Sequence, residues 1–189
     1  SFRFDGPLDM RMNRYAKITA KDIINQYNEK QLSDIFYQYS EIHNSNKLAS
    51  LIVRARNAGE IDSIGKLVTI IDSCIPADQQ NKYLAKVFQA LRIEVNKEMS
   101  GLKALLLQAG EVIGKNGRMA VISYHSNEDR LVKNYFKTGN FEGKQDKDIY
   151  GNCQTPFKTL HNKVIVPEEQ EMEHNPRSRS AKLRIAQKN

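Results

Sequence analysis

The segment Met119–Arg130, with the sequence MAVISYHSNEDR, decides the fold class of this chain of 189 residues. Its first four residues form an uninterrupted apolar run bounded by turn-forming residues, which is typical of a strand buried on both faces. Ser126 and Asp129 then mark the start of a helix, which we expect to continue to about Lys137. A buried strand that passes directly into a helix indicates an α/β sheet domain.

Downstream of this segment, the sequence predicts two more strands. Residues 163–166 form a short run that ends at Pro167. Near the C-terminus apolar and basic residues alternate, which predicts a half-buried strand whose apolar set faces the core: Ala181, Leu183 and Ile185. We expect the polar stretch 138–155 to be a surface loop.

Upstream of it, the sequence predicts helices. Apolar residues recur with helical spacing around residues 32–39, 48–59 and 67–75. A further helix is expected over residues 20–28, with Thr19 as its N-cap and Asp22 as the partner in a weak capping box. Residues 83–113 carry one long helical face, in which we expect a break or bend at Gly101.

These patterns together predict an α/β protein that carries a helical insert. We place the insert at residues 15–85, between residues 1–14 and residues 86–189, which we assign to one α/β domain. The order helix, strand, helix, strand, strand over the second half is that of the later part of such a domain.

Charge and composition restrict the function. Lys and Arg number 29 and Asp and Glu 22, so the formal net charge is +7, which suits a polyanionic partner without naming one. Residues 177–189 hold five bases and no acid. No run of 18 apolar residues predicts a membrane span, and the two cysteines and four histidines form no disulfide or metal motif. We therefore expect an intracellular protein with no membrane association and no metal.

The first candidate site is the segment 123–130, at the carboxyl end of the predicted buried strand. Open α/β sheets bind ligands at this end of their strands. We take His125, Ser126 and Asp129 as candidate catalytic residues, with Tyr124 beside them, and expect Ser126 to cap the free amides of the helix. A plain helix cap with a hydrogen-bonded histidine accounts for the pattern equally well.

The second candidate site is the segment 175–182, NPRSRSAK. Guanidinium groups and hydroxyls hold phosphate oxygens, and an extended chain would place Arg177 and Arg179 on one face. In an extended chain these arginines would lie on the same face as Ala181, Leu183 and Ile185, which are expected to face the core. The strand must therefore begin after them, or they must be buried with partners.

Two further polar segments have a simpler structural interpretation. Asp9 and Arg11, within residues 6–12, suit a site, but a turn with a local ion pair is the favoured interpretation. The acidic run 168–173 is expected to be a solvated face.

Taken together, these segments resemble the RsmH (MraW) family of small-subunit ribosomal RNA cytosine-N4 methyltransferases. The resemblance is carried by four phrases in order: SFRFDGPLDMRMN (1–13), KVFQALRIEVNKE (86–98), AVISYHSNEDRLVKNYF (120–136) and NPRSRSAKLRIA (175–186). The family usually has Asp where Asn13 stands and Leu where Asn127 stands. The segment 30–80 resembles it least.

The resemblance implies a class I (Rossmann-like) methyltransferase domain interrupted by an all-helical domain. It implies S-adenosylmethionine as the cofactor and, as the substrate, a cytidine in the decoding region of 16S rRNA, free or in the assembled 30S subunit, in the bacterial cytoplasm. This chain matches the C-terminal two thirds of the family. The N-terminal part, which holds the cofactor loop, is absent, so we assign no cofactor-binding residue and expect the chain to be inactive alone.

On this basis we expect a set of residues to face the RNA substrate: Asp9, Arg11, Tyr124, Asn175, Arg177, Ser178, Arg179 and Lys182. Two alternative functional classes remain open at this point. One is a non-catalytic basic RNA-binding module, and the other is a purely structural fragment with no site of its own.

Overall fold

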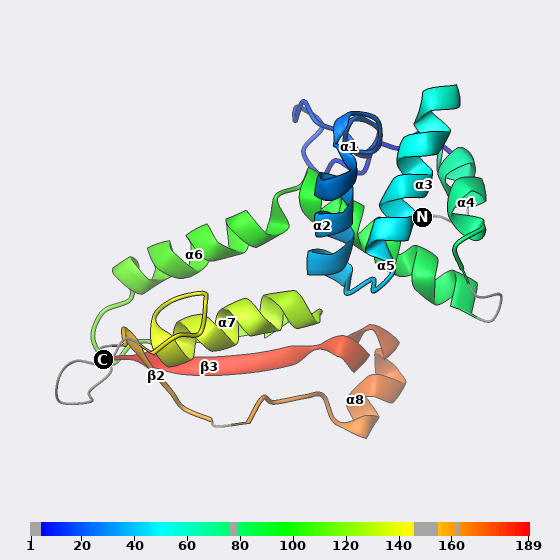
Figure 1. The fold of residues 1–189 in the computed structure, drawn as a ribbon. Coiled ribbons are helices and arrows are strands. Elements are labelled where there is room, and N and C mark those ends of the chain that lie inside the picture. The colour runs from blue at the N-terminus through cyan, green and yellow to red at the C-terminus, as the bar shows by residue number, and fades with distance from the viewer. Residues whose placement is uncertain (1–4, 76–78, 146–154, 162) are drawn as a thin grey trace. The chain divides into compact units, whose positions relative to one another are not determined.

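The computed structural model describes residues 5–75, 79–145, 155–161 and 163–189 (Figure 1). The chain forms two compact units, Ser1–Glu98 (unit 1) and Met99–Asn189 (unit 2), and each is described by itself. None of the helices in these described ranges is long and apolar enough to cross a membrane.

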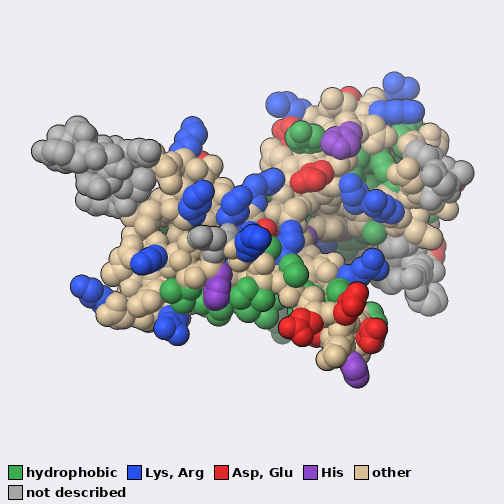
Figure 2. Space-filling model, turned by 90° about the horizontal axis from the view of Figure 1, so that it is seen from below, with side chains coloured by type: hydrophobic (Ala, Val, Ile, Leu, Met, Phe, Trp, Pro, Cys, Tyr) green, Lys and Arg blue, Asp and Glu red, His purple; other side chains and the backbone are tan. Residues whose placement is uncertain are grey.

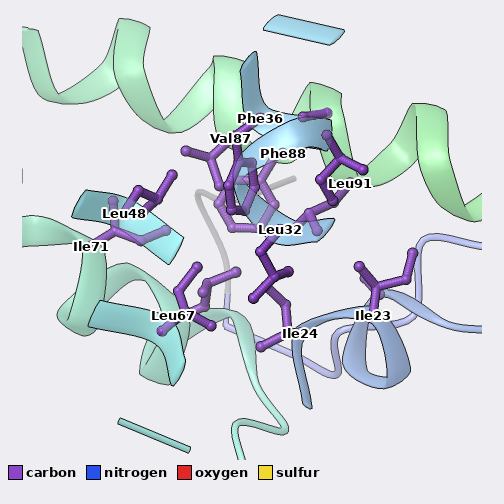
Figure 3. Close-up of a cluster of buried hydrophobic side chains, with 14 of the residues drawn as sticks. Ile23, Ile24, Leu32, Phe36, Leu48, Leu67, Ile71, Val87, Phe88 and Leu91 are labelled. Carbon is purple, nitrogen blue, oxygen red and sulfur yellow. The ribbon is translucent and has the colours of Figure 1, made fainter. Parts of the chain in front are cut away.

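Unit 1 is a bundle of short helices, as the amphipathic spacing predicts. Its helices are α1 (Ala20–Gln26), α2 (Glu29–Ser40), α3 (Ser45–Ala58), α4 (Ile64–Asp72) and α5 (Gln80–Val95). Their apolar faces meet in one core, shown in Figure 3, whose labelled side chains are buried: Ile23, Ile24, Leu32, Phe36, Leu48, Leu67, Ile71, Val87, Phe88 and Leu91. Thr19 caps α1 in a capping box with Asp22, so this predicted helix start is confirmed.

The N-terminal segment packs against the helices of unit 1. Leu8 is buried in the core, its amide donates to the carbonyl oxygen of Asp62, and its carbonyl oxygen accepts from the amide of Lys21. The boundary between the compact units lies after Glu98. The predicted boundaries after residues 14 and 85 mark where a helical insert would interrupt an α/β domain. They stay a prediction.

The long helix expected over residues 83–113 is interrupted, but not at Gly101. It is divided into α5 and α6 (Glu98–Val112), with Lys97 between them in the left-handed backbone region at φ 52°. The Asn96 side chain fixes this break, because its amide donates to the carbonyl oxygens of Arg92 and Met10 at 2.8 and 2.9 Å. Gly101 lies inside α6, so the predicted position of the break was wrong.

Unit 2 is a small α/β unit. Besides α6 it contains β1 (Arg118–Ser123), α7 (Ser126–Thr138), β2 (Phe157–Thr159), α8 (Glu169–His174), a 3₁₀ helix η2 (Pro176–Ser180) and β3 (Lys182–Lys188). The strand order is β1-β3-β2, with both pairs antiparallel. Figure 1 shows α7 lying along β3. The core of the unit joins the two longer helices to one face of the sheet: Leu106, Met119, Val132, Tyr135, Phe136, Phe157 and Ala186.

The C-terminal strand was predicted correctly, but the face that it buries was predicted incorrectly. The face of β3 that packs against the helices carries Lys182, Arg184 and Ala186, whereas Leu183 and Ile185 lie on the other face. The small side chain of Ala186 leaves room for the aromatic rings of the core, and the charge of Arg184 is matched by an aspartate described below.

The strand β1 was expected to be buried on both faces, and this expectation was wrong. Met119 and Ser123 are buried, but Ala120 is exposed and Ile122 is 57% exposed. Ala120 pairs with Ile185, and Ile122 with Leu183, so the uncovered side of the sheet is apolar. Figure 2 shows a band of exposed hydrophobic side chains on this unit.

The second predicted strand, residues 163–166, was also placed wrongly. Only an isolated bridge between Ile165 and Leu183 occurs there, and the third strand of the sheet is β2. Three residues are too few to show an alternating pattern, which is why β2 has no recognisable signal in the sequence. Of the loop expected over residues 138–155, residues 146–154 lie outside the described residues.

Candidate functional site at the end of the first strand

The N-terminus of α7 is closed by His125 and not by Ser126. The His125 Nδ1 atom accepts a hydrogen bond from the Glu128 amide at 3.4 Å, and the Glu128 carboxylate accepts hydrogen bonds from the amides of Tyr124 and His125. Ser126 is the first helical residue and is exposed, so its predicted role as the cap was wrong. The Nε2 atom of His125 lies 3.1 Å from a Glu128 oxygen.

The Glu128 carboxylate is held in its charged form by this capping arrangement. Burial alone raises its pKa, but the interactions with the His125 side chain and the Tyr124 amide outweigh burial, so the pKa lies below its usual value of 4.5. A negative charge in the first turn also interacts favourably with the helix dipole. The pair thus fixes the backbone at the point where β1 passes into α7.

Asp129 joins α7 to β3. Its two carboxylate oxygens accept hydrogen bonds from Arg184 Nε at 2.6 Å and Nη2 at 3.0 Å, and Lys182 Nζ lies 3.8 Å away. The Asp129 side chain is 12% exposed and that of Arg184 18%. A carboxylate whose oxygens are both engaged by a guanidinium is suited to holding a helix and a strand together.

The two candidate segments meet at one edge of the sheet. Ser123 pairs with Lys182 across β1 and β3, and its hydroxyl donates to the Lys182 carbonyl oxygen at 3.4 Å. The end of β1, the cap of α7 and the start of β3 therefore lie together, with His125 at the cap. Tyr124, 57% exposed, follows the buried Ser123 at this edge.

The Arg-Ser segment is helical and not extended. Residues 176–180 form η2, and β3 begins only at Lys182, in agreement with the prediction that the strand starts after the arginines. Arg177 and Arg179 are exposed, while Ser178 is buried and donates to the Asn175 carbonyl oxygen at 2.8 Å. The Ser178 hydroxyl is thus used within the turn, whereas both guanidinium groups face solvent.

The acidic run is exposed to solvent, as predicted. Most of it lies in α8, and its glutamates are all exposed. Arg179 lines a shallow pocket together with Glu169 and Glu173 of this helix, so acids lie close to one of the two arginines.

Asp9 and Arg11 lie in unit 1, where they form the local ion pair that the sequence favoured. Arg11 donates from Nε and Nη2 to the two Asp9 oxygens at 2.6 and 2.8 Å, and from Nη1 to the carbonyl oxygen of Ala16. The hydrogen bond from Arg11 lowers the pKa of Asp9 to about 2. The pair stabilises the turn between Leu8 and α1.

Sequence reasoning missed two features of unit 2. One is Arg184, whose ion pair with Asp129 is not visible from spacing. The second is a group of bases beside α7, which includes Lys133, Lys137 and Lys163. The spacing of Lys133 and Lys137, four residues apart on a predicted helix, was the available signal.

Comparisons with known proteins agree with the resemblance in the sequence. The model of the MraW methylase family matches residues 1–189. The chain is 60% identical to a protein of Bacteroides thetaiotaomicron and 59% identical to one of Bacteroides fragilis, both named ribosomal RNA small subunit methyltransferase H. A protein of the same name from Christiangramia forsetii is 46% identical. In each case the match covers 100% of this chain and 62% of the relative, so the chain spans less than two thirds of their length.

Proposed function

The chain belongs to the MraW methylase family, and from this premise we propose that it is part of a methyltransferase that modifies small-subunit ribosomal RNA. The observation that carries the proposal is the family match over the whole chain, together with relatives that bear this name. The net charge of +7 suits an RNA substrate. The finer proposal is N4-methylation of a cytidine in the decoding region of 16S rRNA, in the bacterial cytoplasm.

The chemistry of this reaction requires positioning more than it requires a strong acid or base. The exocyclic amine of cytosine is a poor nucleophile, so the base must be held out of its stack and aligned with the methyl group to be transferred. We propose that the edge formed by Tyr124, His125 and Lys182 faces the RNA substrate. Asp129 supports this edge, the exposed Ser126 lies beside it, and Arg177 and Arg179 hold RNA phosphates nearby.

Two groups at this site that could contact S-adenosylmethionine, which would supply the methyl group, already have partners within the chain. In the first turn of α7 the Glu128 amide is engaged by the His125 side chain, and the Glu128 carboxylate is engaged by the amides of Tyr124 and His125. The buried carboxylate of Asp129 is engaged by Arg184 and is not free for a ribose hydroxyl. We propose that the cofactor is bound mainly by the part of the relatives' length that lies outside this chain.

Binding of S-adenosylmethionine by calorimetry tests this division. We expect a complete protein of the relatives' length to bind it, and this chain to bind it weakly or not at all. Tight binding by the chain would contradict the placement of the cofactor. If the complete protein bound RNA but not S-adenosylmethionine, the alternative function, a non-catalytic basic RNA-binding module, would replace the enzyme.

The uncovered apolar face of the sheet fits a longer protein. Ala120, Ile122, Leu183 and Ile185 lie on this face, and the relatives are longer than this chain. We propose that the rest of the protein packs on it and completes a class I (Rossmann-like) sheet, with residues 15–85 as the helical insert. Solvent-exposed apolar faces of this kind mark interaction sites.

The substitution Ile122→Thr tests this packing. In this chain we expect a change in the free energy of unfolding of less than about 0.5 kcal/mol, because the side chain is already 57% exposed. In the complete protein we expect a loss of about 1–2 kcal/mol by urea unfolding, since the apolar side chain would be buried there. Leu105→Gln on α6 is the matched control, because Leu105 is 56% exposed. Equal effects of Ile122→Thr in both proteins would contradict the proposal.

A further inference from the structure

A cavity of about 280 Å³ lies in unit 2 beside α7. Its polar lining comes from three elements that are distant in sequence: Lys133 and Lys137 of α7, Thr159, His161 and Lys163 at and after β2, and Arg184 of β3. Phe136 and Ile185 complete the lining. The cavity is many times larger than the roughly 30 Å³ that a water molecule occupies in the liquid.

The described lining of this cavity is basic and contains no acid. Arg184 is neutralised in part by Asp129. Lys133, Lys137 and Lys163, in contrast, form no ion pair with any acid in the described ranges of the chain. Three ammonium groups around one cavity repel one another, and an anion inside it would relieve this repulsion.

The donors around the cavity suit phosphate oxygens. Ammonium groups bind phosphate as point charges, the Thr159 hydroxyl can donate a further hydrogen bond, and His161 offers a ring nitrogen. Lys133 and Lys137 are exposed and one turn apart on α7, so both can turn toward the same anion without a change in the backbone. Figure 2 shows Lys and Arg side chains gathered on this unit beside the hydrophobic band.

We propose that this cavity binds a backbone phosphate of the substrate RNA. The identity of the RNA rests on the proposed function, whereas the anion site rests on the cavity itself. A phosphate held here would fix the register of the RNA on unit 2, in addition to any contact made by Arg177 and Arg179.

The test is the salt dependence of RNA binding by this chain, measured by fluorescence anisotropy with a labelled single-stranded fragment of small-subunit rRNA. In the double variant Lys133→Gln/Lys137→Gln, we expect the slope of log K against log salt to fall by about 1–2, and the affinity to fall roughly tenfold at about 0.1 M salt. The matched control is Lys115→Gln/Lys158→Gln, which removes the same charge from exposed positions of the same unit. We expect a change of about twofold or less in the control.

Equal losses in the two double variants would overturn the proposal, because the effect would then be one of net charge alone. An unchanged slope in the Lys133→Gln/Lys137→Gln variant would overturn it as well. Titration with inorganic phosphate, followed by the NMR signals of Thr159 and His161, provides a second readout. If phosphate shifted these signals saturably in the unaltered chain, but the Lys133→Gln/Lys137→Gln variant bound RNA with unchanged affinity, the cavity would bind free phosphate and not RNA.

Methyl transfer by the unaltered complete protein is measured in parallel. Its absence would contradict the proposed function, and the RNA titrations would still decide whether the cavity binds RNA. Methyl transfer by the complete protein, together with an unchanged salt slope in the Lys133→Gln/Lys137→Gln variant, would contradict only the proposal for the cavity.

Discussion

Replacing Asp129 by alanine is expected to lower the free energy of unfolding of unit 2 by about 3 kcal/mol. The substitution leaves the guanidinium of Arg184, only 18% exposed, without the two hydrogen bonds at 2.6 and 3.0 Å that it makes to the carboxylate. An unpaired charge at a largely buried position costs more than the ion pair contributes. Urea unfolding followed by the NMR amide signals of α7 and β3 measures the effect on this unit alone.

Two controls separate the ion pair from general effects. Lys182→Ala removes a longer contact to the same carboxylate, at 3.8 Å, and should cost less than about 1 kcal/mol. The double variant Asp129→Ala/Arg184→Met should recover part of the loss, because no buried charge is then left unpaired. A loss of less than about 1 kcal/mol for Asp129→Ala would contradict the structural role assigned to this residue.

Replacing Glu94 by alanine is expected to lower the free energy of unfolding of unit 1 by about 3 kcal/mol. The buried Glu94 carboxylate accepts hydrogen bonds from the hydroxyls of Tyr27 at 2.7 Å and Tyr39 at 3.0 Å, and from Lys97 Nζ at 2.5 Å. The substitution leaves the hydroxyls of Tyr27 and Tyr39 without their acceptor and opens a space next to the core. Glu60→Ala, which removes one exposed surface ion pair, is the control and should cost less than about 0.5 kcal/mol.

The same carboxylate makes the stability of unit 1 depend on pH. Burial raises the pKa of Glu94, but the hydrogen bonds from Lys97, Tyr27 and Tyr39 outweigh it, so the folded-state pKa lies below 4.5. Its contribution is therefore complete above the unfolded-state value and is lost as the pH falls through the folded-state value. The wild type should lose stability over this acidic range more steeply than Glu94→Ala. If the free energy of unfolding fell equally with pH in the wild type and in Glu94→Ala, the assignment of this pH dependence to Glu94 would be contradicted.

The helices of unit 1 could be predicted because their signals are local. Amphipathic spacing and the Thr19 capping box need only neighbouring residues, and both are confirmed by the structure. The break between α5 and α6 could not be predicted, because it depends on the Asn96 side chain bonding to Met10, far away in the sequence. An isolated glycine in a helical pattern was the only local signal, and Gly101 is accommodated in α6.

The sheet of unit 2 was harder to predict, because which face is buried is decided by what packs on it. The alternation in β3 is a valid strand signal, but it does not say which side is covered. The helices α6 and α7 cover the side of Arg184 and Ala186, which is possible because Asp129 neutralises the arginine. The apolar side was expected to be the core and lies uncovered in this chain.

The candidate site was predicted in its position more than in its details. The segments around His125 and Lys182 do meet at the end of β1. The identity of the cap could not be predicted, because Ser126 with Asp129 and His125 with Glu128 both have capping-box spacing and serine is the preferred cap residue. The catalytic and RNA-binding roles of the candidate residues stay proposals.

The most direct measurement is methyl transfer by a complete protein of the relatives' length, incubated with S-adenosylmethionine labelled in its methyl group and with small-subunit rRNA or assembled 30S subunits. Mass spectrometry of the digested RNA then identifies the modified nucleoside and its position. We predict N4-methylcytidine in the decoding region, and no product with this chain alone. Unmodified RNA, or a methyl group on ribosomal RNA of the large subunit, would contradict the assignment of this chain to a small-subunit rRNA methyltransferase.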